Sequence, residues 1–376
     1  MNRLLRAASI ALLAGAGLAA LAATGALAKE YVIAVNKPNN LHVIDADARK
    51  VVNSCTLPGR GSPVAIATSP VDPAVAFVET NGWGEVVGVN IDSCEVFFHA
   101  VLSQGTVRAR SMAGVAVGLD GKELFVQVAE TELLADRYQI RPMHRFLVYN
   151  TDAGLDAKPA RSFDVPRGQT IMAPSHDGKT LWSYGHEVRQ FDIATGKILQ
   201  EIRLNSWEED KPTYGDPDGL SFWPLYDNID VMIFPYVAPV FASREARDAG
   251  DFDQLSDFVL GITTVDLRTN EWAQRDITSF DVLIFSMVTH PKKPSEIYAV
   301  YTTLSKYDLD TGKLVDRVDL DHTYYAAAIS AEGDELYIGG TFNDVAIYST
   351  DTLKQLAKVM LPGGDQGVAG IRVIQR

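Results

Sequence analysis

A short pattern that repeats seven times constrains the fold more than any other feature of this sequence. Each copy has a segment that ends in Asp, Asn or Ser, then a turn of four residues, then a second segment. Four of the six intervals between copies are 41–45 residues long, which is the length of one four-stranded propeller blade. The turns follow Asp45, Asn90, Asn150, Asp192, Asp266, Asp308 and Ser349.

The residue types of the repeat are those that a β-hairpin needs. The leading Asp, Asn or Ser can accept hydrogen bonds from backbone N–H groups two or three residues further on. The last turn position is Gly or Asn in four copies, which suits the left-handed conformation that closes such a turn. The segments after the turns alternate over short runs, as in residues 202–204 and 318–320. The repeat therefore predicts an all-β chain folded as a seven-bladed β-propeller.

The two ends of the repeat region complement each other. The first copy has only three expected strands, at residues 31–35, 41–45 and 51–57, and its innermost strand is missing. The last copy is followed by one spare strand at residues 368–374. We expect this C-terminal strand to supply the inner strand of blade one and to close the ring, because closure removes exposed sheet edges. Residues 29–376 then form one propeller domain.

The N-terminus has the pattern of a signal peptide. Arg3 and Arg6 precede an Ala- and Leu-rich stretch at residues 7–23, and Ala26-Leu27-Ala28 is a small-residue cleavage site. We predict that residues 1–28 are removed on export, so that the mature chain begins at Lys29 and has no membrane segment. The alternative is an uncleaved anchor, since the stretch is just long enough to span a bilayer.

Composition and motifs exclude several classes of function. The formal net charge of −14 argues against binding to nucleic acid or anionic lipid, which require basic surfaces. The same charge would steer a cationic partner surface toward the chain, or simply keep it in solution. Motifs for c-type haem, nucleotide loops and a serine nucleophile are all missing, and the seven His residues show no metal-ligand spacing. We expect this chain to bind no metal or cofactor and to hold no catalytic residue.

Cys55 and Cys94 are the only cysteines, and the sequence leaves their state open. An exported protein meets an oxidising compartment, which favours a disulfide. The repeat register argues for two free thiols. Cys94 lies at the hairpin tip of blade two, whereas Cys55 lies six residues past the equivalent position in blade one, which is about 20 Å along a strand. A disulfide needs Cα atoms within about 7 Å, so it would require an offset between the blades.

Insertions lengthen two of the intervals, and three of the five candidate binding residues lie in one of them. The insertions lie at residues 129–145, 205–227 and 243–257. Aromatic residues in long loops outside a repeat favour a protein interface over core packing. The candidates for a partner surface or substrate pocket are Trp207, Tyr214, Trp223, Tyr324 and Tyr325.

Stretches within these loops resemble the β subunit of quinohemoprotein amine dehydrogenase. They are Asn205-Ser206-Trp207-Glu208, residues 280–286, Asp321-His322-Thr323-Tyr324-Tyr325 and Leu361-Pro362-Gly363-Gly364. The resemblance implies a periplasmic complex that oxidises primary amines to aldehydes. It also implies an α subunit that is a dihaem cytochrome c, and a small γ subunit that carries cysteine tryptophylquinone. The propeller would then hold no redox group, scaffold the quinone subunit and help to wall the amine pocket.

Three other functions fit the same repeats. The chain could be a stand-alone periplasmic propeller that binds other molecules. It could be a propeller lactonase, which would need His, Glu and Arg side chains to converge on one face. It could also resemble the large subunit of methylamine dehydrogenase, another propeller that serves a quinone subunit.

Overall fold

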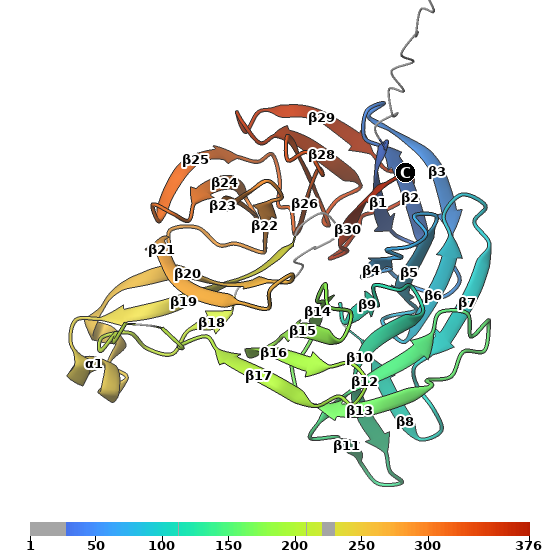
Figure 1. The fold of residues 1–376 in the computed structure, drawn as a ribbon, viewed down its shortest axis with the longest axis horizontal. Coiled ribbons are helices and arrows are strands. Elements are labelled where there is room, and N and C mark those ends of the chain that lie inside the picture. The colour runs from blue at the N-terminus through green and yellow to red at the C-terminus, as the bar shows by residue number, and fades with distance from the viewer. Residues whose placement is uncertain (1–27, 112, 208, 220–229) are drawn as a thin grey trace, which may run out of the picture.

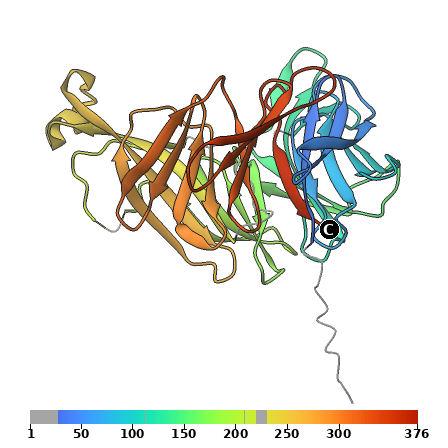
Figure 2. The ribbon, with the colours of Figure 1, turned by 90° about the horizontal axis from the view of Figure 1, so that it is seen from above.

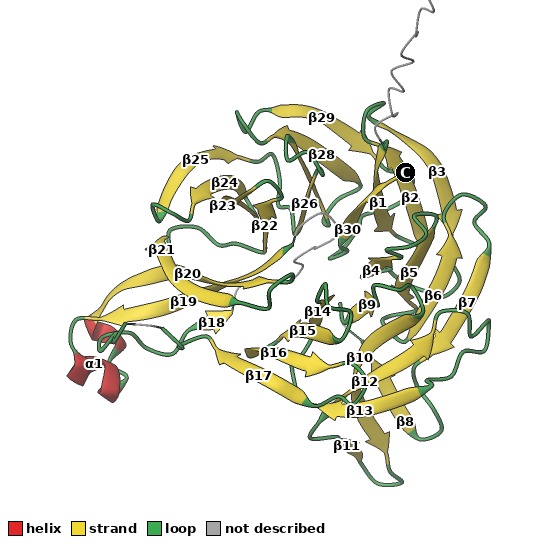
Figure 3. Cartoon of the chain, viewed as in Figure 1, coloured by secondary structure: helices red, strands yellow, loops and turns green. Residues whose placement is uncertain are grey.

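Seven sheets, six of them with four strands and one with six, are arranged around a central axis in the computed structural model (Figure 1). The structure describes residues 28–376 except 112, 208 and 220–229. The predicted signal peptide, residues 1–28, therefore lies almost entirely outside the described residues. Within the described part, no helix is long and apolar enough to cross a membrane. The predicted seven-bladed, all-β fold is confirmed, and Figure 3 shows a helix only at one side of the ring.

The strands of each blade follow in order from the axis outward. Blade 1 contains β30 (Ile371–Gln375), β1 (Glu30–Asn36), β2 (Asn40–Asp45) and β3 (Lys50–Thr56), and blade 2 contains β4 (Ile66–Thr68), β5 (Val75–Thr80), β6 (Glu85–Asn90) and β7 (Val96–Val101). Blade 3 contains β9 (Val115–Val117), β10 (Glu123–Leu133), β12 (His144–Asn150) and β13 (Arg161–Val165), and blade 4 contains β14 (Ile171–Pro174), β15 (Thr180–Tyr184), β16 (Glu187–Asp192) and β17 (Ile198–Arg203).

The remaining blades follow the same order. Blade 5 contains β18 (Asp218–Gly219), β19 (Val231–Phe241), β20 (Leu255–Asp266) and β21 (Trp272–Ser279), and blade 6 contains β22 (Ser286–His290), β23 (Lys293–Val300), β24 (Thr303–Asp308) and β25 (Lys313–Asp319). Blade 7 contains β26 (Ala326–Ile329), β27 (Glu335–Gly339), β28 (Asp344–Ser349) and β29 (Gln355–Met360). Outside the four-stranded pattern lie β8 (Val107–Arg110), β11 (Tyr138–Ile140), the helix α1 (Arg244–Ala249) and the 3-10 helix η1 (Phe252–Gln254).

The core lies between neighbouring blades. Strand β2 is buried along nearly its whole length, because both faces of a blade are covered by its neighbours, whereas the outer strand β3 alternates between exposed and covered residues. Aromatic rings interlock across these interfaces. The ring of Phe98 in blade 2 lies 5.4 Å from that of Phe77 and 5.8 Å from that of Tyr149 in blade 3, both edge to face.

The repeated turn has the geometry that its residues predict. In blade 4, Asp192 Oδ1 accepts a hydrogen bond of 2.8 Å from the backbone N–H of Thr195. The residue that closes the turn has a positive φ in all seven copies, although only four of the seven are Gly or Asn. These closing residues are Arg49, Cys94, Gly154, Gly196, Asn270, Gly312 and Leu353.

The C-terminal strand closes the ring as predicted, over residues 371–375. Strand β30 pairs antiparallel with β1, with Tyr31 opposite Ile374. The two ends of the described chain also bond to each other, since Lys29 N–H donates to the carbonyl of Arg376 at 2.8 Å and Arg376 N–H donates back at 2.9 Å.

Two long arms rise from one face of the ring. We call it the loop face, because it carries the links from blade to blade and the turns between the second and third strands of each blade. The blade 3 arm is the extended end of β10 with β8 and β11 paired to it. The blade 5 arm is the extended hairpin β19–β20, which ends in α1 and η1. Figure 2 shows both arms on the side of the ring opposite the C-terminus.

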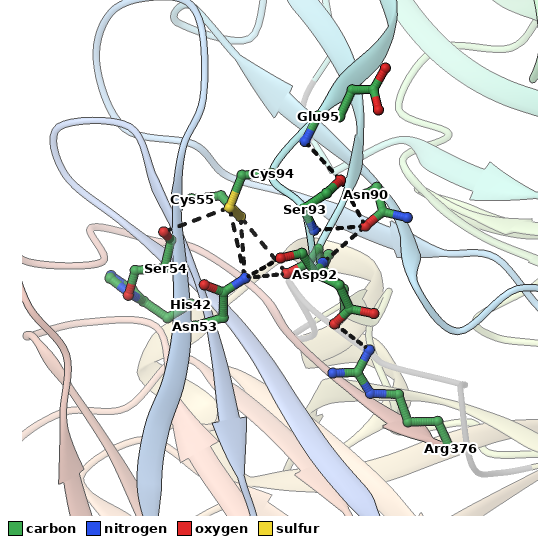
Figure 4. Close-up of a disulfide and its surroundings, with 11 residues drawn as sticks. His42, Asn53, Ser54, Cys55, Asn90, Asp92, Ser93, Cys94, Glu95 and Arg376 are labelled. Atoms are coloured by element: carbon green, nitrogen blue, oxygen red, sulfur yellow. Dashed lines mark hydrogen bonds and ion pairs between the residues drawn. A yellow bond between two sulfur atoms is a disulfide. The ribbon is translucent and has the colours of Figure 1, made fainter.

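Cys55 and Cys94 form a disulfide, so the register argument for two free thiols is wrong (Figure 4). Their Cα atoms lie 5.2 Å apart. The spacing of the cysteines would keep them apart only if neighbouring blades were flat sheets lying side by side. Sheets twist by about 20–25° per strand, so the outer strand β3 is turned across the hairpin tip of blade 2. Asn53 on β3 confirms this contact, since its Nδ2 donates to the carbonyl of Ile91 at 2.7 Å.

Candidate functional site

The candidate residues predicted from the sequence lie in links between blades on the loop face. Trp207 and Tyr214 belong to the link from blade 4 to blade 5, and Tyr324 and Tyr325 belong to the link from blade 6 to blade 7. Trp223 lies outside the described residues. The two described pairs are separated by the width of blades 5 and 6, so the structure does not bring them into one cluster.

Trp207 and Tyr214 are half-buried and are held from beneath by blade 5. The indole Nε1 of Trp207 donates to the hydroxyl of Tyr236 at 2.8 Å, and its ring packs edge to face on Tyr214 at 5.3 Å. The hydroxyl of Tyr214 donates to Asp276 Oδ2 at 2.9 Å. These contacts fix the shape of the link, and both rings remain partly exposed.

Lys211 completes this cluster from the solvent side. Its ammonium forms an ion pair with Asp276 and lies 5.5 Å from the centre of the Trp207 ring and 4.8 Å from that of Tyr214. This is the position that a cation takes over an aromatic face. Burial and the hydrogen bond to Asp276 together raise the pKa of Tyr214 to about 12. The phenol therefore stays protonated near neutral pH and acts as a donor.

A polar cavity of about 520 Å³ lies beside this cluster, between the link and the blade 5 arm. Trp207 and Tyr214 form part of its wall, and Arg247 and Asp248 of the arm form another part. The link adds the carboxylates of Glu209, Asp210 and Asp216. This end of the loop face is therefore acidic and favours approach by a cationic surface.

Tyr324 and Tyr325 are neighbours in sequence but have different environments. Tyr324 has no exposed surface, donates to Asp344 Oδ2 at 2.8 Å and stacks on His322 with ring centres 4.0 Å apart. Burial raises its pKa well above the ordinary range. Tyr324 is thus a packing residue, and we leave it out of any surface for a partner. Tyr325 is half-exposed and stacks on Phe285, with ring centres 4.6 Å apart.

The arms carry exposed apolar residues that the sequence analysis did not single out. On the blade 3 arm, Tyr138 is 78% exposed and Ile140 is 62% exposed. On the blade 5 arm, Phe252 is 66% exposed. Each lies inside an insertion that the sequence predicts. These residues could have been identified as apolar residues in otherwise polar insertions.

Both arms are built to hold these residues in place. In the blade 3 arm, the buried carboxylate of Glu130 bonds to Arg141 at 2.8 Å and to Arg145 at 3.4 Å. In the blade 5 arm, Ser243 caps α1 by accepting from the N–H of Ala246 at 3.1 Å. Blade 4 lies between the two arms in the ring (Figure 1). The loop face therefore offers two ordered projections with apolar tips and an acidic cavity near one of them.

The cysteines, histidines and acidic residues are the side chains that could attach a cofactor or bind a metal ion. Both sulfur atoms are used in the disulfide, so neither is available for a thioether bond to haem or for a cross-linked quinone. Among residues 28–376, apart from the gaps, no group of three or more His, Cys, Asp or Glu could hold a metal ion.

Comparison with known proteins identifies the fold. No protein-family model and no curated protein match the sequence. The structure resembles hydrazine synthase of Kuenenia stuttgartiensis, with a TM-score of 0.54 and 14% identity over 86% of this chain and 90% of that chain. It also resembles the dihydro-heme d1 dehydrogenase NirN, with a TM-score of 0.52 and 12% identity over 92% of this chain and 75% of that chain.

A third similar structure comes from Desulfotomaculum acetoxidans and is described as functionally unknown. Its TM-score is 0.58, with 13% identity over 92% of this chain and 98% of that chain. At these identities the three structures share the propeller fold with this chain, and the likeness is one of fold alone.

Proposed function

We propose that this chain is the propeller subunit of a periplasmic amine dehydrogenase of the quinohemoprotein type. It carries no redox group and binds its partners through the loop face. The observation that carries the proposal is that two exposed aromatic side chains, Tyr138 and Phe252, and the half-buried Trp207 lie on this one face. Exposed aromatic anchors on rigid supports are the residues that dominate protein interfaces.

The resemblance to the amine dehydrogenase β subunit implies the division of labour in such a complex. The small quinone subunit would oxidise the primary amine to an aldehyde, and the dihaem cytochrome c subunit would take the electrons. The propeller would hold the quinone subunit in place and cover the amine pocket. Trp207 and Tyr214 present apolar surface with their polar atoms already bonded within the chain, which suits the exclusion of water.

The structural likenesses give this proposal limited support. Two of the similar proteins are named as enzymes, a synthase and a dehydrogenase of a haem derivative. They support only the statement that a β-propeller can be part of a redox enzyme. The stretches that resemble the amine dehydrogenase β subunit are what favour an amine as the substrate.

Purification of the tagged chain from its native host tests the proposal. We expect it to bring along a protein that stains for haem and a small protein that stains for quinone, with amine-dependent dye reduction. Purification of the chain alone, or with partners that stain for neither group, would favour a stand-alone binding propeller instead.

Two exposed positions test the docking face. Tyr138→Ser and Phe252→Ser should each weaken assembly by about tenfold or more, because truncated anchor residues typically cost about 2 kcal/mol in binding. Their melting temperatures should stay unchanged, since both side chains are mostly exposed. Leu155→Ser is the matched control, because Leu155 is 63% exposed in a turn on the opposite face. Normal assembly of both arm variants would place the interface elsewhere.

A further inference from the structure

A second cavity on the loop face lies apart from both arms. It has a volume of about 470 Å³ and a mostly apolar wall. Tyr325, Val64 and Val368 in this wall come shortly before the inner strands β26, β4 and β30, so the cavity lies at the mouth of the central channel. Three aromatic residues from three separate loops converge on it: Trp83, Tyr325 and Phe342.

Trp83 is held in a backbone conformation that a large side chain rarely adopts. Asn81, Gly82 and Trp83 have consecutive φ angles of 52°, 59° and 66°. Gly and Asn enter this left-handed region easily, whereas a tryptophan is strained there. Trp83 is only half-buried, so core packing offers little in return. Strained residues of this kind gather at binding sites, where the strain serves to place a side chain.

Tyr325 is fixed by a stack of rings behind it. The ring of Phe285 lies 4.6 Å from that of Tyr325 and 4.5 Å from that of Tyr301, and the three rings are close to parallel. Such a stack orients Tyr325 without any contact from within the cavity. The wall of the cavity is therefore arranged before anything binds.

Polar groups in the wall are few. The hydroxyl of Thr341 is buried and has no hydrogen-bond partner in the described part of the chain. Lys37 and Asp365 form an ion pair of 2.8 Å at the rim and neutralise each other. A mostly apolar cavity with few polar groups matches the usual make-up of a small-molecule site, and its volume lies within the usual range of about 300–1,000 Å³.

We propose that this cavity binds a small, uncharged or cationic molecule with a planar aromatic ring. The ring lies against Trp83 and Tyr325. An anion is disfavoured because the chain carries a net charge of −14. The proposal is independent of the amine dehydrogenase assignment, since it rests on a different cavity and needs no partner subunit.

Calorimetric titration of the mature chain with 2-phenylethanol tests the site. We expect 2-phenylethanol to bind about three- to tenfold more tightly than 2-cyclohexylethanol, because only the former can stack, and phenylacetate to bind more weakly than both 2-phenylethanol and 2-phenylethylamine. Equal affinity for the aromatic and the saturated ring, or no binding of 2-phenylethanol, would overturn the proposal.

Variants separate binding from folding. Tyr325→Phe should keep binding and Tyr325→Leu should lose it. Trp83→Asn should lose binding with an unchanged or higher melting temperature, because Asn relieves the strain. Phe258→Leu, a change at an exposed aromatic residue of β20, is the control and should bind as the parent does. A sharp fall in the melting temperature of Trp83→Asn would show a packing role, and normal binding by this variant would equally refute the site.

Discussion

Glu79 is a carboxylic acid that the fold surrounds completely. It lies near the end of β5 and has no exposed surface. Its carboxyl group accepts hydrogen bonds from Ser111 Oγ at 2.5 Å and from the N–H of Ala113 at 3.2 Å, which ties the link between blades 2 and 3 to blade 2. Burial raises the pKa of Glu79 to about 7, although these hydrogen bonds oppose the rise.

This pKa predicts a pH dependence of stability. The carboxyl group loses its proton near pH 4.5 in the unfolded chain but only near pH 7 in the folded chain. Between these values the folded state holds more protons, so the contribution of Glu79 to the free energy of unfolding falls as the pH rises. Between pH 4.5 and pH 8, the parent should lose on the order of 3 kcal/mol of unfolding free energy through Glu79. Glu79→Gln should not show this loss. Urea unfolding at both pH values measures it.

The exposed Glu95 provides the control for this prediction. Glu95→Gln should leave the pH dependence as it is in the parent, because Glu95 lies in solvent at a hairpin turn. If Glu79→Gln and the parent lose the same stability between the two pH values, another group is responsible for the loss.

Single residues show where sequence reasoning ends. The turn residues could be predicted because their role depends on neighbours two to four positions away. Tyr324 and Tyr325 could not be told apart, because which of two adjacent rings faces the core depends on blade 7 packing against them. Trp207 is similar, since its half-burial depends on Tyr236 in the next blade. Loss of this contact would also affect folding, so Trp207→Ala is a poorer test of the interface than Tyr138→Ser.

At the level of elements, the outer strand of a blade reaches the hairpin tip of the next blade. Besides Asn53 and Ile91, the contact recurs where Arg161 of blade 3 donates to the carbonyl of Ile193 in blade 4 at 2.9 Å. In blade 5, Arg275 donates to the carbonyl of Leu309 in blade 6 at 3.3 Å. Sequence spacing gives the position of a residue along its strand but not the twist of the sheet, which is why the spacing of the two cysteines misled.

The disulfide replaces such a contact with a covalent one. Because it links residues 39 positions apart, the chain-entropy account gives a stabilisation of about 4 kcal/mol. We expect the double variant Cys55→Ser/Cys94→Ser to lose about 2–4 kcal/mol of unfolding free energy in urea. Reductant should destabilise the parent and leave the variant unchanged. Two free thiols in denatured, unreduced parent protein would contradict the bond itself.

The sequence predicts which blades carry the two arms, but it does not predict that the arms lie on the same face. The intervals of 60 and 74 residues marked blades 3 and 5 as enlarged. Both arms fall between the second and third strands of their blades, and in an antiparallel sheet all such turns emerge on one side. The order of the strands therefore explains why both arms lie on the same face. The exposure of Tyr138 and Phe252 depends on the conformation of each arm, which the strand order does not give.

The whole molecule is a ring whose closure depends on one short strand. Strand β30 adds Ile371, Val373 and Ile374 to the core between blades 7, 1 and 2. Each such side chain contributes about 1.5–3 kcal/mol on burial, so their sum is comparable with the 5–15 kcal/mol that typically separates a folded from an unfolded protein. Without β30, the inner edge of β1 would also be left unpaired.

Removal of residues 371–376 should therefore abolish the cooperative fold. We expect the truncated mature chain to elute as aggregates in size-exclusion chromatography and to lose the sharp thermal transition of the parent. A truncated chain that stays monomeric with an unchanged melting temperature would show that closure by β30 is dispensable.

A circular permutant separates closure from connectivity. Lys29 and Arg376 bond backbone to backbone, so a short Gly-Ser linker can join the two ends, and new ends can be opened between Arg60 and Gly61 in the link from blade 1 to blade 2. Blade 1 is then one continuous piece of chain with its inner strand first. Because β30 still pairs with β1, the permutant should stay monomeric and melt within about 5 °C of the parent, which corresponds to roughly 3–4 kcal/mol for a chain of this size. If the permutant aggregates as the truncated chain does, the order in which the blades are joined is itself required, and the strand pairing alone does not account for the closed ring.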